Sequence, residues 1–278
     1  MFPTVGISFK PEHLEAALQS PADGLWFEIH PENYMVAGGM RAAILAAISD
    51  ARPISMHGVG LSLAGAESPD PSHLGRLREL VNRHEPFLVS EHLAWSRLGN
   101  THFPDLLPFP RTAEALSRIV DNIDQVQEAL GRAILIENPA LYIHLDDHEW
   151  SETEFLAEVV SRAGCGLLID VNNVYVSARN LGYDASAYLD ALPFAAIGEI
   201  HVAGHRPDPV HGAELLIDSH DSPVAEPVWS LFSQLISRTG PLPTLIERDG
   251  NIPGFDELIS ERDRAASIIA ASKVLVDA

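Results

Sequence analysis

Apolar and polar positions alternate along this chain in two regular ways. Eight short segments are almost continuously apolar and end in polar residues, a pattern typical of strands buried on both faces of a parallel sheet. The predicted strands span residues 4–9, 24–30, 53–59, 86–93, 133–139, 166–172, 198–204 and 243–249. Other segments carry apolar residues at helical spacing. The predicted helices span residues 11–19, 40–50, 73–84, 112–130, 151–163, 185–191, 225–238 and 256–275.

Local capping signals support two of these helices. Residues 112–130 read TAEALSRIVDNIDQVQEAL, with Thr112 as a candidate N-cap, Glu114 in the first turn and an apolar stripe of helical period. Residues 151–164 read SETEFLAEVVSRAG, which starts with a serine and glutamate pair and ends at a glycine suited to a C-cap. We therefore expect both segments to be helical.

A strand followed by a helix, repeated eight times, is typical of an α/β protein with the (β/α)8 TIM barrel fold, which we predict here. A doubly wound parallel sheet has the same alternation, and periodicity alone leaves it open. The longest irregular stretches, residues 60–72, 94–110 and 205–224, follow predicted strands and would share one rim of a barrel. Because no linker or internal repeat interrupts the pattern, we expect one domain over residues 1–278.

Composition narrows the classes of partner. Acidic residues outnumber basic ones by 39 to 18, giving a formal net charge of −21, and no Lys/Arg cluster offsets it. We therefore expect no nucleic acid partner, because such a field repels phosphate. No apolar run approaches the roughly 18 residues of a membrane helix, and MFPTVGISFK lacks the features of a signal peptide, so we expect a cytoplasmic protein with no membrane partner. The single cysteine, Cys165, excludes an intrachain disulfide and a thiolate metal site.

Nine residues with metal-binding side chains lie at or after the ends of predicted strands. They are His57, His92, Glu137, Asp170, Asn173, His201, Asp218, His220 and Glu247. Burying several carboxylates together is costly unless protons or cations compensate their charge, and metal ions would do so. One ion rarely takes more than about four to six protein ligands, so this set indicates two or three ions.

Four further polar residues are candidates for substrate chemistry. Asp249 follows Glu247 by two residues and is predicted to transfer protons, with the capping of a turn as an equal alternative. Glu28 and Asn33 lie in or after the second predicted strand and are predicted to line the substrate mouth. His205 is a candidate substrate contact, with a structural role as the alternative.

Eight segments, taken in order, resemble the methanobactin-biosynthesis oxygenase family of multinuclear non-haem iron enzymes. They are FEIHPENYM, SMHGVGLSLAG, LVSEHLAWS, LIENP, LIDVNNVYVSARNLG, EIHVAGH, LLIDSHDSPV and LIERDGNIP. The resemblance covers nearly the whole chain, from residue 4 to residue 265. It implies the TIM barrel of the superfamily that contains xylose isomerases and endonuclease IV.

The resemblance to the three-metal arrangement of endonuclease IV also implies how the ligands are shared. His57, His92 and Glu137 would hold the first ion. Glu137, Asp170, His201 and Glu247 would hold the second, with Glu137 as the bridge. Asn173, Asp218 and His220 would hold the third. Asn173 is a departure, because the endonuclease pattern has a histidine there, and the weaker amide ligand predicts a loosely held third ion.

The function implied by the resemblance is oxidative modification of cysteine residues in a ribosomally synthesised precursor peptide. The expected cofactors are two to three iron ions (Fe2+/Fe3+), with dioxygen as co-substrate. The expected products are of the oxazolone and thioamide or the thiooxazole type. The expected partners are a Cys-containing precursor peptide and a partner protein that binds the peptide leader, giving a heterodimer.

Two other classes of function stay open. A metal-dependent sugar isomerase or phosphodiesterase would use the same barrel, although the charge of −21 argues against a DNA substrate and no lysine stands out near the ligands for sugar isomerisation. A non-catalytic metal-binding protein within a biosynthetic complex is the third class. The full set of nine ligands weighs against it.

Overall fold

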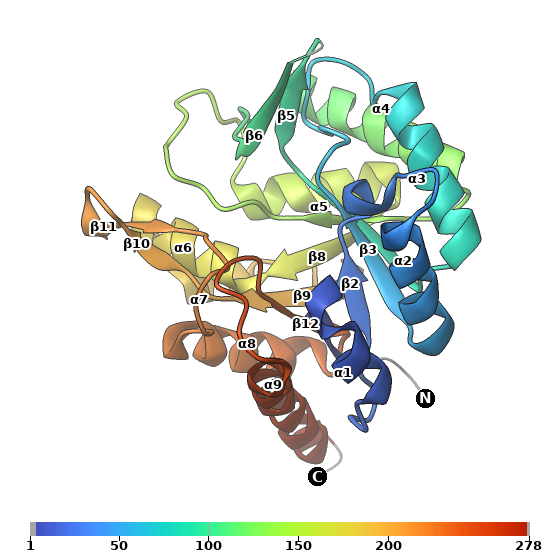
Figure 1. Cartoon of the computed structure of the whole chain (residues 1–278). Coiled ribbons are helices and arrows are strands. Elements are labelled where there is room, and N and C mark those ends of the chain that lie inside the picture. The colour runs from blue at the N-terminus through green and yellow to red at the C-terminus, as the bar shows by residue number, and fades with distance from the viewer. Residues whose placement is uncertain (1–3, 100, 277–278) are drawn as a thin grey trace. The chain divides into compact units, whose positions relative to one another are not determined.

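The computed structural model describes residues 4–99 and 101–276, in which strands and helices alternate along the chain (Figure 1). Within these residues, the barrel strands are β1 (Val5–Ser8), β2 (Phe27–Ile29), β3 (Ile54–Gly58), β4 (Leu88–His92), β7 (Leu135–Glu137), β8 (Gly166–Asp170), β9 (Ile197–Ala203) and β12 (Thr244–Glu247). Their order is β1-β12-β9-β8-β7-β4-β3-β2, a closed barrel. The predicted (β/α)8 TIM barrel is confirmed, and a doubly wound sheet, which is open at its edges, is excluded.

The described helices, with one exception, agree closely with those expected from the pattern. They are α1 (Leu14–Gln19), α2 (Met40–Ala51), α3 (Pro71–His84), α4 (Ala113–Leu130), α5 (Glu152–Ala163), α6 (Val171–Leu181), α7 (Ala185–Asp190), α8 (Glu226–Thr239) and α9 (Phe255–Val276). Short 3-10 turns are η1 (Pro11–His13), η2 (Pro31–Tyr34) and η3 (Phe194–Ala196).

The expected caps are confirmed. The Thr112 hydroxyl accepts a hydrogen bond from the amide of Ala115. Ser151 and Glu154 form a reciprocal capping box at the start of α5, and Gly164 ends that helix in the left-handed region with φ 64°.

Helix α6 is absent from the prediction. The strand expected over residues 166–172 ends at Asp170, because the Asp170 carboxylate accepts a hydrogen bond from the amide of Asn173 and caps a helix that starts at Val171. The strand predicted over residues 166–172 is therefore two residues too long. Two antiparallel hairpins also lie in stretches expected to be irregular: β5 (Trp95–Leu98) with β6 (Thr101–Leu107), and β10 (Arg206–Asp208) with β11 (Gly212–Ile217).

Contacts group the chain into two units. The first comprises Met1–Glu28, Ala140–His144 and Leu168–Ala278, and the second comprises Ile29–Pro139 and Leu145–Leu167. The single domain expected for residues 1–278 stays a prediction.

In the first unit, β1 pairs in parallel with both β2 and β12, and β12 pairs with β9. Helices α8 and α9 pack on these strands. Trp229, Phe232 and Ile236 of α8 are buried together with Ile200 and Val202 of β9. Burial of such apolar side chains supplies the main stabilisation of this core.

In the second unit, β4 pairs in parallel with β3 and with β7. Helix α4 contacts both α3 and α5. Its buried stripe includes Leu116, Ile119, Ile123 and Val126, at the spacing of one helix face. Strand ends in both units are thus held by apolar packing, which leaves their terminal polar residues available for chemistry.

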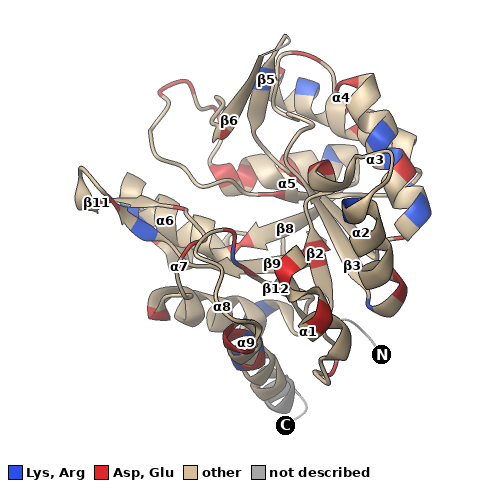
Figure 2. Cartoon of the chain, viewed as in Figure 1, with Lys and Arg blue, Asp and Glu red and all other residues tan. Residues whose placement is uncertain are grey.

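Three further features of the described residues bear on the composition of the chain. None of the described helices is long and apolar enough to cross a membrane. Cys165 is buried, and burial raises the pKa of its thiol to about 12, as for an inert packed cysteine. Acidic residues are spread over many elements (Figure 2). Three of the basic residues, Arg76, Arg78 and Arg83, lie on α3.

Candidate metal centre

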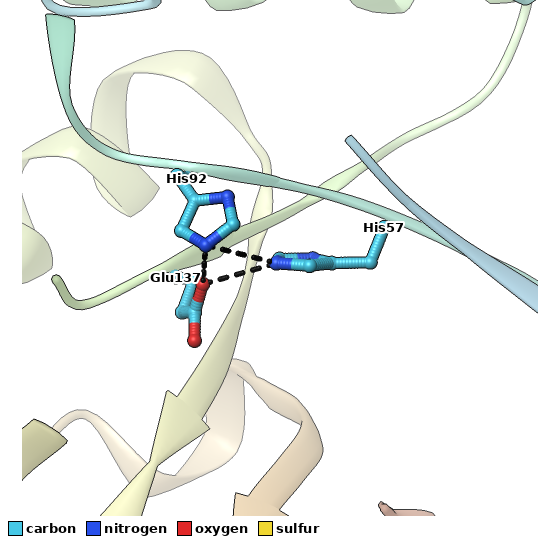
Figure 3. Close-up of side chains that lie close together, drawn as sticks. All are labelled: His57, His92 and Glu137. Atoms are coloured by element: carbon cyan, nitrogen blue, oxygen red, sulfur yellow. Dashed lines mark hydrogen bonds and ion pairs between the residues drawn. The ribbon is translucent and has the colours of Figure 1, made fainter. Parts of the chain in front are cut away.

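Three ligand atoms converge in the second unit. His57 comes from the end of β3, His92 from the end of β4 and Glu137 from the end of β7, and His92 lies opposite Glu137 in the strand register. The Nε2 atoms of the two histidines are 3.2 Å apart, and they lie 3.1 and 3.0 Å from Oε2 of Glu137 (Figure 3). His57 and Glu137 are almost fully buried, with 0% and 1% of their surface exposed.

The opposite ring nitrogens fix how these histidines point. Nδ1 of His92 lies 2.9 Å from the carbonyl oxygen of Gly58, which can only accept, so this nitrogen carries a proton. In a neutral His92 ring, Nε2 then has a lone pair aimed at the Glu137 carboxylate. Nδ1 of His57 lies 2.8 Å from the hydroxyl of Ser90. Such partners orient imidazole ligands around metal ions in many proteins.

Two lone pairs facing each other at 3.0 Å require a cation between or upon them. Without a metal, that cation is a proton: burial would lower the pKa of His92, but the charge of Glu137 outweighs it and raises that pKa to about 10. Burial would raise the pKa of Glu137, and His92 and His57 instead hold it well below its usual range. A divalent metal ion would replace this proton and bind all three ligand atoms, so the residues fit a metal.

A second set of ligands lies in the first unit. Nδ1 of His201, on β9, is 3.1 Å from Oε2 of Glu247, the last residue of β12. Nδ1 of His220 is 3.4 Å from the other Glu247 oxygen. Asp170, His220 and Glu247 offer ligand atoms that all lie within 4.8 Å of one another. This grouping fits a metal site built from two carboxylates and an imidazole.

Asp218 and His220, two residues apart, lie in contact in the first unit. Oδ1 of Asp218 is 2.7 Å from Nε2 of His220. Burial would lower the pKa of His220, but the carboxylates of Asp218 and Glu247 outweigh it and raise that pKa well above its usual value. His220 has a φ of 47°, a left-handed backbone conformation that is uncommon for residues other than glycine.

Glu199 is a site residue that the sequence reasoning missed. Its Oε1 lies 3.7 Å from Nε2 of His201, and Oε1 of Glu28 lies 3.4 Å from the same nitrogen. All three side chains are almost fully buried. The available signal was strand alternation, because Glu199 precedes His201 by two residues and therefore shares its face.

The remaining predicted residues take several positions. Asn173 is buried in the first turn of α6, and Asn33 is exposed in η2, where its carbonyl oxygen accepts a hydrogen bond from Arg41. Asp249 is partly exposed, pairs with Lys10 at 2.8 Å and lies 3.4 Å from Nδ1 of His220. His205 is half-buried and hydrogen-bonded to Asn172. The catalytic role of Asp249 and the substrate contacts of Glu28, Asn33 and His205 stay predictions.

His73, on α3, is a buried histidine outside the two groups of candidate ligands. His73 has 9% of its surface exposed, and its Nε2 lies 3.3 Å from Oε1 of Glu32. The same Glu32 oxygen accepts hydrogen bonds from the amides of Val59 and Gly60. This group joins η2 to α3 and to the loop after β3.

Solved structures with a similar fold come from proteins that share little sequence with this chain. The structure of the IOLI protein with a bound zinc atom matches with a TM-score of 0.64 and 12% identity, covering 97% of this chain and 99% of that one. Endonuclease IV from Thermus thermophilus matches with a TM-score of 0.57 and 17% identity, covering 99% of this chain and all of the other. At such identities the likeness shows the fold, a xylose isomerase-like and endonuclease IV-like TIM barrel.

Close sequence relatives carry the name UPF0276 protein. The chain is 59% identical over 272 residues to the protein from Caulobacter sp. (strain K31), covering 98% of each. It is 57% identical over 273 residues to the protein from Caulobacter vibrioides (strain NA1000 / CB15N), covering 98% of this chain and 97% of the relative. Residues 4–270 match the family model described as RiPP precursor modification enzyme MbnB/TglH/ChrH. The chain therefore belongs to this family of enzymes that modify ribosomally made peptide precursors.

Proposed function

We propose that this protein is a multinuclear non-haem iron enzyme that uses dioxygen to oxidise cysteine residues of a ribosomally synthesised precursor peptide. The observation that carries the proposal is the convergence of His57, His92 and Glu137, whose ligand atoms lie 3.0–3.2 Å apart at the ends of β3, β4 and β7. Family membership supports a peptide substrate. The products proposed are of the oxazolone and thioamide or the thiooxazole type.

The donor chemistry supports iron. Imidazole and carboxylate ligands without thiolate suit Fe(II) that keeps open coordination positions. When bound, iron would supply redox chemistry toward dioxygen and an open position for a substrate thiolate. His57, His92 and Glu137 would hold one ion. Asp170, His201 and Glu247 would hold a second ion. Asn173, Asp218 and His220 would hold a third, and the bridging role of Glu137 stays a prediction.

The protein's own residues prepare the site in two ways. The Gly58 carbonyl and the Ser90 hydroxyl orient the two histidines, so little rearrangement is needed when a metal ion binds. The buried carboxylates supply the negative charge that compensates several divalent ions. We assign proton transfer to Asp249, which lies 3.4 Å from His220 and is partly exposed, with the capping of a turn as the alternative.

Family membership supports a precursor peptide, and we propose a partner protein in addition. The proposed partners are a Cys-containing precursor peptide and a partner protein that binds its leader and forms a heterodimer with this chain. We propose the cytoplasm as the compartment, where precursor peptides are made.

Metal analysis of anaerobically purified protein tests the cofactor. We expect two or three irons per chain by elemental analysis, with coupled signals in Mössbauer spectra. The His57→Ala variant should lose iron, while the matched His211→Ala variant, which changes an exposed histidine, should keep it. Stoichiometric zinc or manganese without iron, after growth in iron-rich medium, would overturn the iron assignment.

Turnover tests the reaction. The iron-loaded protein is mixed with its partner protein and a small Cys-containing peptide encoded beside its gene, and dioxygen uptake and peptide mass are followed together. We expect dioxygen consumption coupled to a loss of mass at cysteine, and none with the Cys→Ser peptide. Modification of the Cys→Ser peptide at an equal rate would contradict the assignment of cysteine as the target.

A further inference from the structure

A series of short hydrogen bonds links His205 to the candidate ligands Asp218 and His220 in the first unit. The side chain of Asn172, in the first turn of α6, is at its centre. Oδ1 of Asn172 lies 2.7 Å from Nδ1 of His205, and Nδ2 of Asn172 lies 2.6 Å from Oδ1 of Asp218. Oδ1 of Asp218 lies in turn 2.7 Å from Nε2 of His220.

The charged Asp218 carboxylate decides which atoms in this series of hydrogen bonds donate and which accept. An ionised Asp218 carboxylate only accepts hydrogen bonds, so the amide nitrogen of Asn172 must face it. The amide oxygen then faces His205, and this oxygen also only accepts. Nδ1 of His205 therefore carries a proton, and in the neutral ring Nε2 is left with a free lone pair. The reverse amide orientation would place two oxygens against each other and is excluded by the same reasoning.

The surroundings of His205 favour its neutral form. The ring is half-buried and lies 5.0 Å from the ring of Tyr175, whose hydroxyl accepts a hydrogen bond from Arg179 at 3.4 Å. Burial lowers the pKa of His205, the charge of Asp218 raises it and that of Arg179 lowers it, with a net fall. The neighbouring cation, Arg206, pairs with Asp221 at 3.4 Å.

We propose that His205 accepts the proton of the substrate thiol through Nε2, and that Asn172 is the positioning residue that sets its tautomer. This inference rests on the proposed function. In the step, the S–H bond breaks, its electron pair stays on sulfur as a thiolate, and the proton forms a new N–H bond that turns His205 into an imidazolium. The thiolate is the form of cysteine that binds a metal ion, so the step prepares substrate binding.

The tautomer is measured first, on metal-free protein with 15N-labelled histidine. Long-range 15N–1H NMR spectra, assigned with the His205→Gln variant, should show a protonated Nδ1 and a bare Nε2 at neutral pH. In Asn172→Leu, which keeps the size of the side chain but removes the amide, the His205 signals should move toward a mixture of both tautomers. A protonated Nε2 in the unmodified protein, or no change in Asn172→Leu, would overturn the inference.

The pH profile of kcat/KM with a Cys-containing peptide is measured second. The profile should rise as His205 loses its proton. In His205→Gln the rate should fall by roughly 10²- to 10⁴-fold near neutral pH and recover toward pH of about 8.5, where a free thiol ionises unaided. His211→Gln, which changes an exposed histidine of the β10–β11 hairpin, serves as the control and should keep the full rate.

The two measurements separate the inference from the proposed function. If the unmodified enzyme turns over the peptide and His205→Gln keeps its rate and profile, with metal content and circular dichroism unchanged in both, the inference fails alone. If no Cys-containing peptide reacts with the unmodified enzyme, the proposed function fails, and the NMR result alone then stands for or against the role of Asn172 and His205.

Discussion

At the scale of single residues, the site is defined by lone pairs that face one another. Nε2 of His57 and His92 and Oε2 of Glu137 all point to one spot, and the backbone of Gly58 prevents His92 from turning away. A proton compensates this arrangement in part, and a divalent cation compensates it fully. The same residues that leave uncompensated charge in the metal-free protein thus make it a candidate for metal binding.

The Glu137→Gln variant tests this interpretation. The amide removes the negative charge and one ligand atom from the first ion. Loss of an outer partner costs about 10- to 100-fold in metal affinity, and loss of a ligand should exceed that. Elemental analysis and titration calorimetry should show the first ion missing. The matched variant Glu114→Gln, at a glutamate on α4 whose side chain is 90% exposed, should bind as the unmodified protein does, and equal metal content in both variants would refute the assignment.

Gly204 helps to position the loop that carries Asp218 and His220. Its carbonyl oxygen accepts a hydrogen bond from the amide of His220 at 3.0 Å, and a Cβ at this position would collide with the backbone carbonyl of Ser222. Gly204→Ala should therefore displace the loop that carries both ligands and destabilise the fold by about 1–3 kcal/mol.

Urea unfolding and metal titration measure these effects. The control is Gly75→Ala, because Gly75 lies inside α3 with open space around its Cβ position. This change should stabilise the protein by about 0.5–1 kcal/mol through helix propensity. If Gly204→Ala were as stable as the unmodified protein, the loop would be free to yield and the argument would not stand.

At the scale of elements, the candidate ligands lie on the segments that the fold holds most firmly. His57, His92 and Glu137 lie at the ends of three paired parallel strands, and their register follows from backbone hydrogen bonds. Side chains, and not strand pairing, hold the loops in place. Glu32 has such a side chain, since it joins η2 to α3 and to the loop after β3.

Glu32 predicts a pH dependence of stability. Burial would raise its pKa, but hydrogen bonds from His73 and from the amide of Val59 outweigh burial and lower the pKa below the ordinary value of 4.5. The folded state therefore holds the proton less tightly than the unfolded state does. The stabilisation is fully present above pH of about 4.5 and is lost as the pH falls through the lower folded-state pKa.

Urea unfolding of the unmodified protein and of Glu32→Gln checks this. At pH 7 the variant should be less stable by about 1–2 kcal/mol, because a hydrogen-bonded charge is replaced by an amide. The difference in stability should shrink as the pH falls below the pKa of this carboxyl group in the unfolded state. A difference that stays constant down to the acid transition would show that ionisation of Glu32 contributes nothing.

At the scale of the whole molecule, the formal charge of −21 would be partly balanced by the proposed metal ions. Among the described residues, Glu28, Glu137, Asp170, Glu199 and Glu247 are all buried. Buried carboxylates destabilise a fold unless cations compensate them, so bound metal should contribute to folding stability as well as to chemistry.

Thermal unfolding under anaerobic conditions tests this coupling. Fe(II) at about a thousand times its Kd should stabilise the protein by roughly 4 kcal/mol, which for a chain of this size corresponds to a rise in Tm of about 10 °C. Removal of the ion with a chelator should reverse the rise. A Tm that is insensitive to Fe(II), Mn(II) and Zn(II) alike would show that the buried carboxylates are compensated by protons alone.

The sequence by itself determined the features that depend on neighbours along the chain. The apolar runs predicted each barrel strand, and the capping residues Thr112 and Ser151 predicted the starts of α4 and α5, because both signals are local. Strand-end positions also singled out His57, His92 and Glu137, since parallel strands bring equivalent ends together. Their shared contact at 3.0–3.2 Å follows from that regularity.

Only the tertiary structure decided which polar groups from distant segments meet. It placed Glu28 and Glu199 against His201, and it gave Asn172 two partners, His205 and Asp218, that lie 33 and 46 residues away in sequence. These outcomes depend on side-chain packing and hydrogen bonds across the fold, and no pattern of neighbouring residues encodes such long-range contacts.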